Sequence, residues 1–376
     1  MPGLTFRSLV LLLAGVLVVA ASAARAEPQT VETRSGAVAV ENVTDGLDHP
    51  WGMTFLPDGR MLVTERPGRL RIVSSDGSVS PPLEGTPEVF AQDQGGLLDV
   101  ALDPDFASNR LVYLSFAEPS RAAASTALGR GRLADNRIEE FEVIFRQEPK
   151  IPGGKHFGSR IVFSSEGHVF LTLGERFQFD PAQDLSNHLG TIVRVNRDGS
   201  IPEDNPFVGR ENAEDEIWSY GHRNIEAAAI HPETGQLWIG EMGPRGGDEL
   251  NVIERGANYG WPVVSWGRHY VGGDIPDPPT HPEFAGSVKH WTPVISPSGM
   301  IFYTGAMFPE WHGNALIGGL TSQELVRVVF EGREVADEER IALGARIREV
   351  EQGPDGAVYV LTDQDDGNVW RITPAR

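Results

Sequence analysis

Residues 51–73, with the sequence WGMTFLPDGRMLVTERPGRLRIV, contain two apolar runs separated by the turn LPDG at 56–59. Proline, aspartate and glycine at these positions favour a tight reversal, and the apolar and β-branched residues on either side favour strands. The same arrangement returns near the end of the chain, around GPDG at 353–356. The stretch therefore predicts a pair of antiparallel strands that recurs along the chain.

Six segments share this pattern of strand, turn and strand, and they cover residues 51–73, 97–116, 158–175, 224–242, 299–320 and 347–369. Their turns follow one another at intervals of about 45 to nearly 80 residues, which suits a four-stranded blade with insertions. We therefore predict an all-β fold, a six-bladed β-propeller. A pair of β-sandwiches or an irregular all-β fold is the alternative.

Two further segments carry predictions about the ring. Residues 37–43 read as a strand that completes the last blade and closes the propeller. Residues 122–133 have a helix-like composition but no sustained stripe of period 3.6, so we predict a loop there. No linker rich in Ser or Pro divides the chain after residue 26. One catalytic propeller domain is therefore predicted over residues 27–376.

The first 26 residues differ in kind from the rest. Arg7 precedes an apolar run over residues 9–20, and small residues that suit signal peptidase follow it. We predict a secretory signal peptide over residues 1–26 and a periplasmic or secreted protein. An uncleaved anchor is the alternative, although ~12 apolar residues fall short of the ~20 that span a bilayer. No second run of this kind follows, so no membrane span is predicted in the mature chain.

Charge and composition exclude several classes of function. The 376 residues carry a formal net charge of −21 and no cysteine. Such acidity disfavours nucleic acid and anionic membrane as partners, because phosphate binding depends on cationic side chains. The missing cysteines exclude disulfides, thiolate metal sites and cysteine nucleophiles. The sequence also lacks a P-loop, HExxH, GxSxG and a dinucleotide-binding glycine motif, so its chemistry must use oxygen, nitrogen or a bound cofactor.

Candidate site residues lie in loops beside the repeats, where propellers bind ligands. His156 stands between glycines in PGGKHFGSR at 152–160, and a neutral imidazole there could take a hydroxyl proton. An exposed histidine or a turn partner is the alternative. Gln94 opens the second repeat and could offer its amide to a polar ligand.

Three arginines stand out against the acidic background. Arg223 and Asn224 enter the fourth repeat and could hold an anion or a quinone oxygen, or else stabilise the blade through a salt bridge. Arg346 and Arg348 are two residues apart at a strand entry and therefore point the same way. They could capture carboxylates through bidentate contacts, or form a surface ladder with Glu349 or Glu351.

The loop GEMGPRGGDE at 240–249 combines glycines with carboxylates. Ca²⁺ takes six to eight oxygen ligands, many of them backbone carbonyls, so such a loop suits calcium better than zinc. The loop does not follow the EF-hand pattern. A solvated acidic turn is the alternative to a calcium site.

Together these segments resemble the soluble sugar dehydrogenases that depend on pyrroloquinoline quinone (PQQ), the glucose/sorbosone dehydrogenase family, and more closely its aldose sugar dehydrogenase branch. The matching stretches run in order along nearly the whole mature chain. They are HPWGM at 49–53, QGGLL at 94–98, GKH at 154–156, GHRN at 221–224, EMGPRGGDELN at 241–251, NYGWP at 258–262, and RIR at 346–348 before GPDG at 353–356.

The resemblance implies that PQQ lies across the channel mouth with Ca²⁺ at its quinone edge. His156 would be the general base that takes the proton of the sugar's anomeric hydroxyl while hydride passes to the quinone, with Arg223 and Gln94 beside the reacting groups. Arg346 and Arg348 would pair the carboxylates of PQQ. The cofactor-binding residues implied in this way are Gln94, His156, Arg223, Asn224, Arg346 and Arg348.

The resemblance also implies two calcium sites. The carbonyls of Gly243 and Pro244 would ligate the catalytic ion. Asp248, Glu249 and Tyr259 match a second, structural site. Calcium would act as a Lewis acid on the quinone carbonyl.

Two positions depart from the family pattern. Thr321 stands where well-known members carry a lysine that contacts PQQ, so weaker cofactor binding is expected. Lys155 stands where the glucose enzymes carry an acid beside the histidine, so the sugar preference is expected to differ.

We therefore expect an enzyme that oxidises an aldose to its lactone. It would pass electrons to a separate quinone or cytochrome, because the chain has no haem motif, and act as a monomer or homodimer. A calcium-dependent lactonase on the same fold is the enzymatic alternative. A propeller that binds sugar or protein without turnover is the other, since propellers host many functions.

Overall fold

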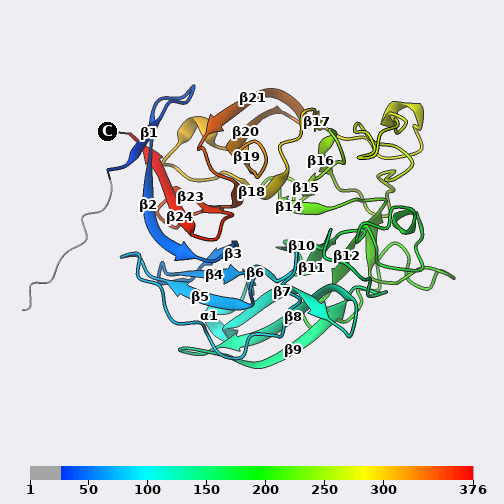
Figure 1. Cartoon of the computed structure of the whole chain (residues 1–376), viewed down its shortest axis with the longest axis horizontal. Coiled ribbons are helices and arrows are strands. Elements are labelled where there is room, and N and C mark those ends of the chain that lie inside the picture. The colour runs from blue at the N-terminus through cyan, green and yellow to red at the C-terminus, as the bar shows by residue number, and fades with distance from the viewer. Residues whose placement is uncertain (1–26, 376) are drawn as a thin grey trace, which may run out of the picture.

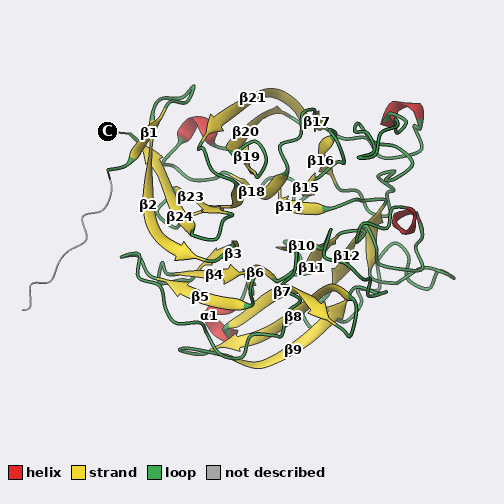
Figure 2. Cartoon of the chain, in the orientation of Figure 1, coloured by secondary structure: helices red, strands yellow, loops and turns green. Residues whose placement is uncertain are grey.

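Six small sheets stand around a common centre in the computed structural model, which describes residues 27–375 (Figure 1). Strands joined by loops make up almost all of the ring, and helices are confined to short turns (Figure 2). The prediction of an all-β, six-bladed propeller is confirmed. The predicted signal peptide lies outside the described residues.

The first three blades follow one another along the chain. Blade 1 consists of β3 (Pro50–Phe55), β4 (Met61–Glu65) and β5 (Arg69–Val73). Blade 2 consists of β6 (Leu97–Leu102), β7 (Leu111–Pro119), β8 (Ala124–Leu133) and β9 (Ile138–Arg146), with the single-turn helix α1 (Phe106–Asn109) between β6 and β7. Blade 3 consists of β10 (Gly158–Phe163), β11 (Val169–Leu173), β12 (Thr191–Val195) and β13 (Ile217–Tyr220).

The other three blades complete the ring. Blade 4 consists of β14 (Ile225–Ile230), β15 (Leu237–Glu241), β16 (Asp248–Val252) and β17 (Lys289–Trp291). Blade 5 consists of β18 (Pro297–Phe302), β19 (Ala315–Gly319), β20 (Glu324–Glu331) and β21 (Glu334–Ala342). Blade 6 consists of β22 (Ile347–Gln352), β23 (Val358–Thr362) and β24 (Gly367–Pro374), extended by β2 (Val38–Leu47) and β1 (Gln29–Val31). Three 3₁₀ turns lie at Asp180–Gln183, Pro278–Thr280 and Pro309–Trp311.

Blade 6 joins the two ends of the described chain. β2 pairs antiparallel with β24, and their register places Val40 opposite Ile372. The strand predicted over residues 37–43 therefore exists and closes the ring as expected. Closure gives both strands a hydrogen-bonded neighbour that neither would have in an open sheet.

The loop predicted over residues 122–133 is wrong, because β8 occupies this stretch. It pairs with β7 on one side and β9 on the other. Small residues suit this place, since a Cβ added at Gly129 would lie 2.4 Å from the ring of Phe141 on β9. Packing against the neighbouring strand, which the local sequence does not show, explains this composition.

The first strand of each blade lies nearest the centre of the ring. β3, β6, β10, β14, β18 and β22 each contact the next one around. Every one of them has a register shift close to its beginning, so each starts with a β-bulge or similar irregularity. Bulges re-aim side chains at the rims of sheets. In β6, β10 and β22 the irregular stretch includes a buried polar residue, which is Asp99, Arg160 and Arg348 respectively.

Arg160, on β10, holds this centre together and touches all six blades. Its guanidinium pairs with Asp99 of blade 2 at 3.3 Å and with Glu349 of blade 6, and it donates to the carbonyl of Arg348 at 2.9 Å. It also donates to the carbonyl of Glu226 in blade 4 at 2.6 Å and to Ser298 of blade 5 at 3.4 Å. The ring of Trp51 in blade 1 stacks 4.1 Å away. We call Arg160 and these partners the Arg160 hub.

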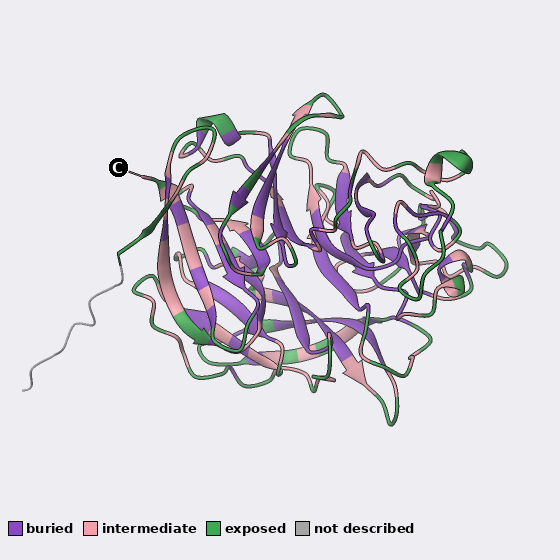
Figure 3. Cartoon of the chain, turned by 45° about the horizontal axis from the view of Figure 1, so that its top comes forward, coloured by how far each residue is buried: buried purple, intermediate pink, exposed green. Residues whose placement is uncertain are grey.

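Apolar side chains fill the spaces between the blades. Middle strands such as β4, β11 and β19 are buried along their whole length, whereas β21 at the outside of blade 5 is largely exposed (Figure 3). Burial between sheets stabilises each blade against its neighbours. The result is a ring of packed sheets that carries loops at its two ends.

Candidate active site

A cavity of about 830 Å³ opens at the end of the ring where the inner strands begin. Its lining comes mostly from loops just before the first strand of a blade or just after the second. Antiparallel pairing brings these two positions together at one end of every blade. The charged groups of the lining are five arginines, Arg66, Arg223, Arg245, Arg346 and Arg348, and three acids, Asp93, Glu226 and Asp363. In a chain of net charge −21, this excess of cations marks a binding site for an anion.

His156 reaches this cavity from the loop before β10. Its backbone is left-handed, with φ of 55°, and the residue is 5% exposed. The Nδ1 atom lies 2.8 Å from Oε1 of Glu175, so the carboxylate holds the tautomer that leaves Nε2 as an acceptor. Burial lowers the pKa of His156, with the charge of Arg223 acting in the same direction and Glu175 opposing them. The imidazole is therefore a neutral base near neutral pH.

Glu175 is itself held in place. Its carboxylate is buried, and Oε2 accepts the backbone N–H of Gln178 at 2.5 Å. One oxygen thus orients the histidine while the other is fixed by the loop that follows β11. This arrangement positions His156 without using its free nitrogen.

Gln94 and Asn224 hold the histidine loop from two sides. The side-chain oxygen of Gln94 accepts the backbone N–H of His156 at 2.6 Å. Asn224 accepts the N–H of Gly158 at 3.1 Å and donates to Glu226 at 3.0 Å. Both predicted residues line the cavity, and both also fix the backbone on which His156 stands.

Arg223 lies between the rings of Trp261 and Tyr270, at 5.3 and 5.6 Å from their centres. Its Nη1 donates to the carbonyls of Met242 and Gly243 at 2.9 and 2.8 Å. The Nε atom is buried and has no hydrogen-bond partner among the described residues. This side chain thus connects the start of blade 4 to the acidic loop and still has a donor to offer.

Arg346 and Arg348 also line the cavity, and their partners are not the expected ones. Arg348 pairs with Glu226 and, at 2.7 Å, with Asp363, whereas Arg346 pairs with Asp363 at 3.1 Å. Although burial alone would raise the pKa of Asp363, the two guanidiniums hold it well below its usual range. The ladder with Glu349 or Glu351 considered above does not form, because Glu349 belongs to the Arg160 hub. Arg348 is buried, but the side chain of Arg346 is 45% exposed.

Residues of the acidic loop line both the main cavity and a second, smaller space. Gly243 and Pro244 line the main cavity. Glu249 and Tyr259 line a neighbouring void of about 10 Å³, together with Glu241. Burial, with the charge of Glu241 added to it, raises the pKa of Glu249 to about 8. Two carboxyls beside a void the size of one ion or water form a donor set that suits a cation.

The polar atoms of Asp248 and Tyr259 form hydrogen bonds to the backbone. The carboxylate of Asp248 accepts the backbone N–H groups of Gly243, Ile295 and Ser296, at 2.8, 2.8 and 2.6 Å. The hydroxyl of Tyr259 donates to the carbonyl of Val252 at 2.6 Å. Asp248 therefore fixes the acidic loop, and Tyr259 presents its ring to the small void.

The two departures from the family pattern lie on different sides of the site. Thr321 lines the cavity, and its hydroxyl is 2.5 Å from that of Ser296. Lys155 places its ammonium 4.9 Å from the ring centre of Phe177, which in turn packs 5.1 Å from the ring of His156. An aromatic wall thus stands beside the histidine, with a cation behind it.

Several important residues were missed by reading the sequence, although the repeat contained a signal for them. An acid follows or ends the second strand in four blades, and these acids are Glu65, Glu175, Glu241 and Asp363. Each binds a residue that precedes or begins the first strand of its own blade. These contacts are Glu65 to the N–H of Asp48, Glu175 to His156, Glu241 to His222, and Asp363 to Arg346 and Arg348.

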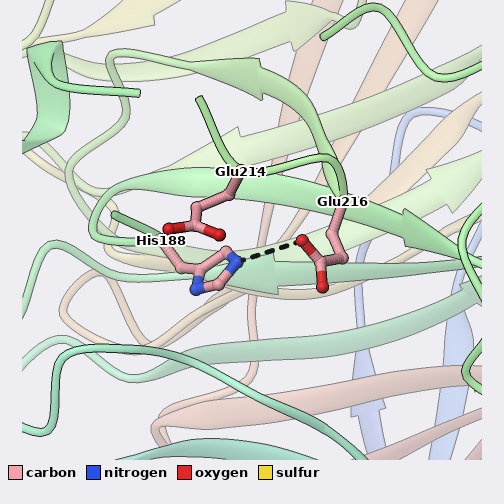
Figure 4. A group of neighbouring side chains, drawn as sticks. All are labelled: His188, Glu214 and Glu216. Atoms are coloured by element: carbon pink, nitrogen blue, oxygen red, sulfur yellow. Dashed lines mark ion pairs between the residues drawn. The ribbon is translucent and has the colours of Figure 1, made fainter. Parts of the chain in front are cut away.

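Among the described residues, one further cluster lies outside this cavity and has ligand atoms spaced for a metal ion. It consists of His188, Glu214 and Glu216 (Figure 4). Nδ1 of His188 accepts the backbone N–H of Glu148 at 3.1 Å, so a neutral ring carries its proton on Nε2. That atom faces Glu216 at 3.5 Å. A metal would need Nε2 without its proton, so the geometry suits a histidine–glutamate pair better than a metal centre.

Comparison with known proteins fits this fold and this cavity. The sequence model of the Glucose / Sorbosone dehydrogenase family matches residues 47–371. The Aldose sugar dehydrogenase YliI of Escherichia coli (strain K12) is 43% identical, over 95% of this chain and 97% of its own length. The soluble Aldose sugar dehydrogenase from Escherichia coli in the apo-form superposes with a TM-score of 0.85 at 43% identity, covering 90% of this chain and 100% of that one.

A further solved structure is the PQQ-bound form of Aldose Sugar Dehydrogenase from Streptomyces coelicolor. It is 28% identical, has a TM-score of 0.73, and covers 89% of this chain and 98% of its own. Fold and comparisons together define an oxidoreductase of the sugar dehydrogenase class on a β-propeller. The chain belongs to the Glucose / Sorbosone dehydrogenase family. None of the helices within residues 27–375 has the length and apolar character needed to cross a membrane.

Proposed function

We propose that this protein oxidises an aldose at its anomeric carbon to the lactone, with PQQ and Ca²⁺ as cofactors. The observation that carries the proposal is the place of His156, a neutral base held by Glu175 at the wall of an arginine-lined cavity. A base beside a cation-rich pocket suits removal of a hydroxyl proton next to an anionic cofactor.

The residues present fit PQQ, which carries three carboxylates on a flat aromatic system. Arg346 and Arg348 would hold carboxylates on one side of the cavity, and Arg223 and Asn224 would face the quinone oxygens. The buried Nε atoms of Arg223 and Arg348 have no partner among the described residues, so each can still donate to a ligand. A hydrogen bond to such a donor would remove the cost of leaving it unsatisfied.

The acidic loop fits calcium at two places. The carbonyls of Gly243 and Pro244 would ligate an ion beside the cofactor. Glu249 would ligate a second ion, because among the described residues the carboxyl of Glu249 is bonded only to Asn251, at 3.1 Å. Glu241 lines the same void. Backbone carbonyls and carboxylates are the ligands that Ca²⁺ prefers.

Two residues of the chain would then carry out the proton transfer and stabilise its product. His156 Nε2 would accept the proton of the C1 hydroxyl, and Glu175 would stabilise the imidazolium that forms. When bound, PQQ with Ca²⁺ supplies the hydride acceptor and its Lewis acid. Loss of the C1 hydride and the hydroxyl proton converts the cyclic aldose to its lactone. The electrons would leave through a separate acceptor, and residues 1–26 would direct export.

The experiment uses residues 27–376 with PQQ and Ca²⁺ and measures dye reduction with a panel of aldoses. His156→Ala should lower turnover by about 100-fold or more while quinone absorbance still follows the protein through gel filtration. His168→Ala is the matched control, because His168 lies in the same blade beyond the opposite end of β10. Absence of both turnover and retained quinone from the unaltered protein would overturn the proposal.

A further inference from the structure

Arg66 differs from Arg346 and Arg348, the two arginines predicted to bind carboxylates. It follows β4 in blade 1, lines the cavity, and forms no ion pair with any carboxylate in residues 27–375. Within the same described range, its guanidinium is hydrogen-bonded only to backbone carbonyls, those of Asp93 and, at 3.4 Å, Gly95. Arg346 and Arg348, by contrast, both pair with Asp363. Arg66 is thus a half-buried cation whose charge the protein leaves without a direct counterion.

The surroundings make this arrangement costly in the absence of a ligand. Burial lowers the pKa of Arg66, and the nearby positive charge of Arg348 lowers it further, while Asp363, Glu226 and Asp93 act against them from a distance. A guanidinium stays charged even so. An anion that binds beside Arg66 would offset the cost of desolvating this guanidinium and the repulsion between Arg66 and Arg348.

The position of Arg66 extends the row of cations around the cavity. Blade 6, which carries Arg346 and Arg348, lies between blade 1 and blade 5 in the ring. Towards blade 5, Arg346 reaches the carbonyl of Leu320 at 3.5 Å, and the next residue is the neutral Thr321. Towards blade 1, the row continues with Arg66. On this side of the lining, the arginines therefore run from blade 6 to blade 1 and not to blade 5.

We propose that Arg66 binds a carboxylate of PQQ directly and forms, with Arg346 and Arg348, a three-arginine clamp that spans blades 6 and 1. This assignment rests on the proposed function. The two backbone carbonyls orient the guanidinium, and its remaining donors match a carboxylate. An uncompensated cation in the empty site becomes a paired one in the loaded site, so its electrostatic gain appears only on binding.

Cofactor affinity, not turnover, tests the assignment. PQQ is titrated into the calcium-loaded, quinone-free protein, and binding is followed by quenching of tryptophan fluorescence. Arg66→Met should raise Kd by about 10- to 100-fold, and Arg66→Lys by less, because the charge remains but the paired donors are lost. Arg60→Met removes the same charge from the other end of the same blade, where Arg60 is paired with Asp58, and should leave Kd unchanged.

The trimethyl ester of PQQ separates a contact with carboxylate from a general effect of the variant. Arg66→Met should bind the ester as well as the unaltered protein does, since the ester has no anionic carboxylate to lose. Equal affinity of Arg66→Met and the unaltered protein for PQQ itself would overturn the assignment alone. An equal loss for PQQ and ester would also overturn it, as a structural effect. Failure of the unaltered protein to bind PQQ would overturn the dehydrogenase proposal and this assignment with it.

Discussion

The Arg160 hub and the arginines of the cavity wall use the same side chain in opposite ways. Arg160 is 4% exposed and is satisfied by two acids, two carbonyls and a hydroxyl from other blades. Arg66 is half-buried and bonded only to carbonyls, and Arg346 is 45% exposed. The difference teaches that a fully buried and paired charge serves the ring, whereas a wall cation that lacks a counterion, as Arg66 does, or that stays half-exposed, as Arg346 does, remains available to a ligand. Changes at the hub should therefore reduce stability, and changes at the wall should reduce binding.

The largest expected effect is that of Arg160→Met. Its loss would leave the carboxylates of Asp99 and Glu349 buried without their cation, so the free energy of unfolding should fall by about 3–5 kcal/mol. Urea denaturation measures it. Arg132→Met breaks an exposed pair with Glu139 in blade 2 and should cost less than about 1 kcal/mol. A loss at Arg160 no larger than at Arg132 would contradict the division between hub and wall.

Glu175→Gln tests, through catalysis, the pair that His156 of the cavity wall forms with Glu175. Because Glu175 raises the pKa of His156 against the effect of burial, its removal should move the acid limb of kcat/KM to lower pH. The maximal rate should fall by about 100-fold, since the tautomer and the imidazolium lose their support. A pH–rate profile gives both quantities. Movement of the acid limb to higher pH would contradict this account of the pair.

Calcium should stabilise the acidic loop, which belongs to neither arginine group. At calcium far above its Kd, the unaltered protein should gain about 2–3 kcal/mol, seen as a rise in Tm. Glu249→Gln should lose much of that rise, because it removes a charged ligand beside the small void. Asp248→Asn gives the comparison, since its bonds to three N–H groups predict a lower Tm with and without calcium. The same calcium-induced rise in Glu249→Gln and in the unaltered protein would count against Glu249 as a ligand.

Arg346→Met should show the smallest effect and the cleanest separation. Since this side chain is half-exposed and Asp363 keeps Arg348, the free energy of unfolding should change by less than about 1 kcal/mol. PQQ affinity should still fall by about 10-fold. Denaturation and cofactor titration on one preparation provide the two numbers. A large loss of stability with unchanged affinity would place Arg346 with the hub.

The fold was predictable because its evidence is local and repeated. Turns such as LPDG at 56–59 indicate the strands on either side of them without reference to the rest of the chain. Residues 37–43 could be assigned because the last blade lacked a strand. The prediction of a loop over residues 122–133 was wrong for the opposite reason. Their strand depends on β7 and β9, and small residues chosen for close packing resemble helix formers when read alone.

The site divides along the same line. Gln94, His156, Arg223, Asn224, Arg346 and Arg348 were predicted from loops and strand entries beside the repeats and from the family resemblance, and all of them line one cavity. Their partners were harder to see, because Glu175, Glu226 and Asp363 look ordinary in sequence. Only the repeated acid after the second strand hinted at Glu175 and Asp363. Arg160 gave no sign at all, since its partners come from every part of the ring.

The pairing of β2 with β24 sets an order of events during synthesis. β2 precedes five blades in the chain, but β24 follows every other described strand, so β2 has only β1 to pair with until β24 is made. The ring cannot close until β24 has emerged. Deleting β24 should therefore leave an open arc with two unpaired sheet edges, and such edges are prone to join between molecules. Closure of the ring therefore depends on β24, the last strand of the described residues.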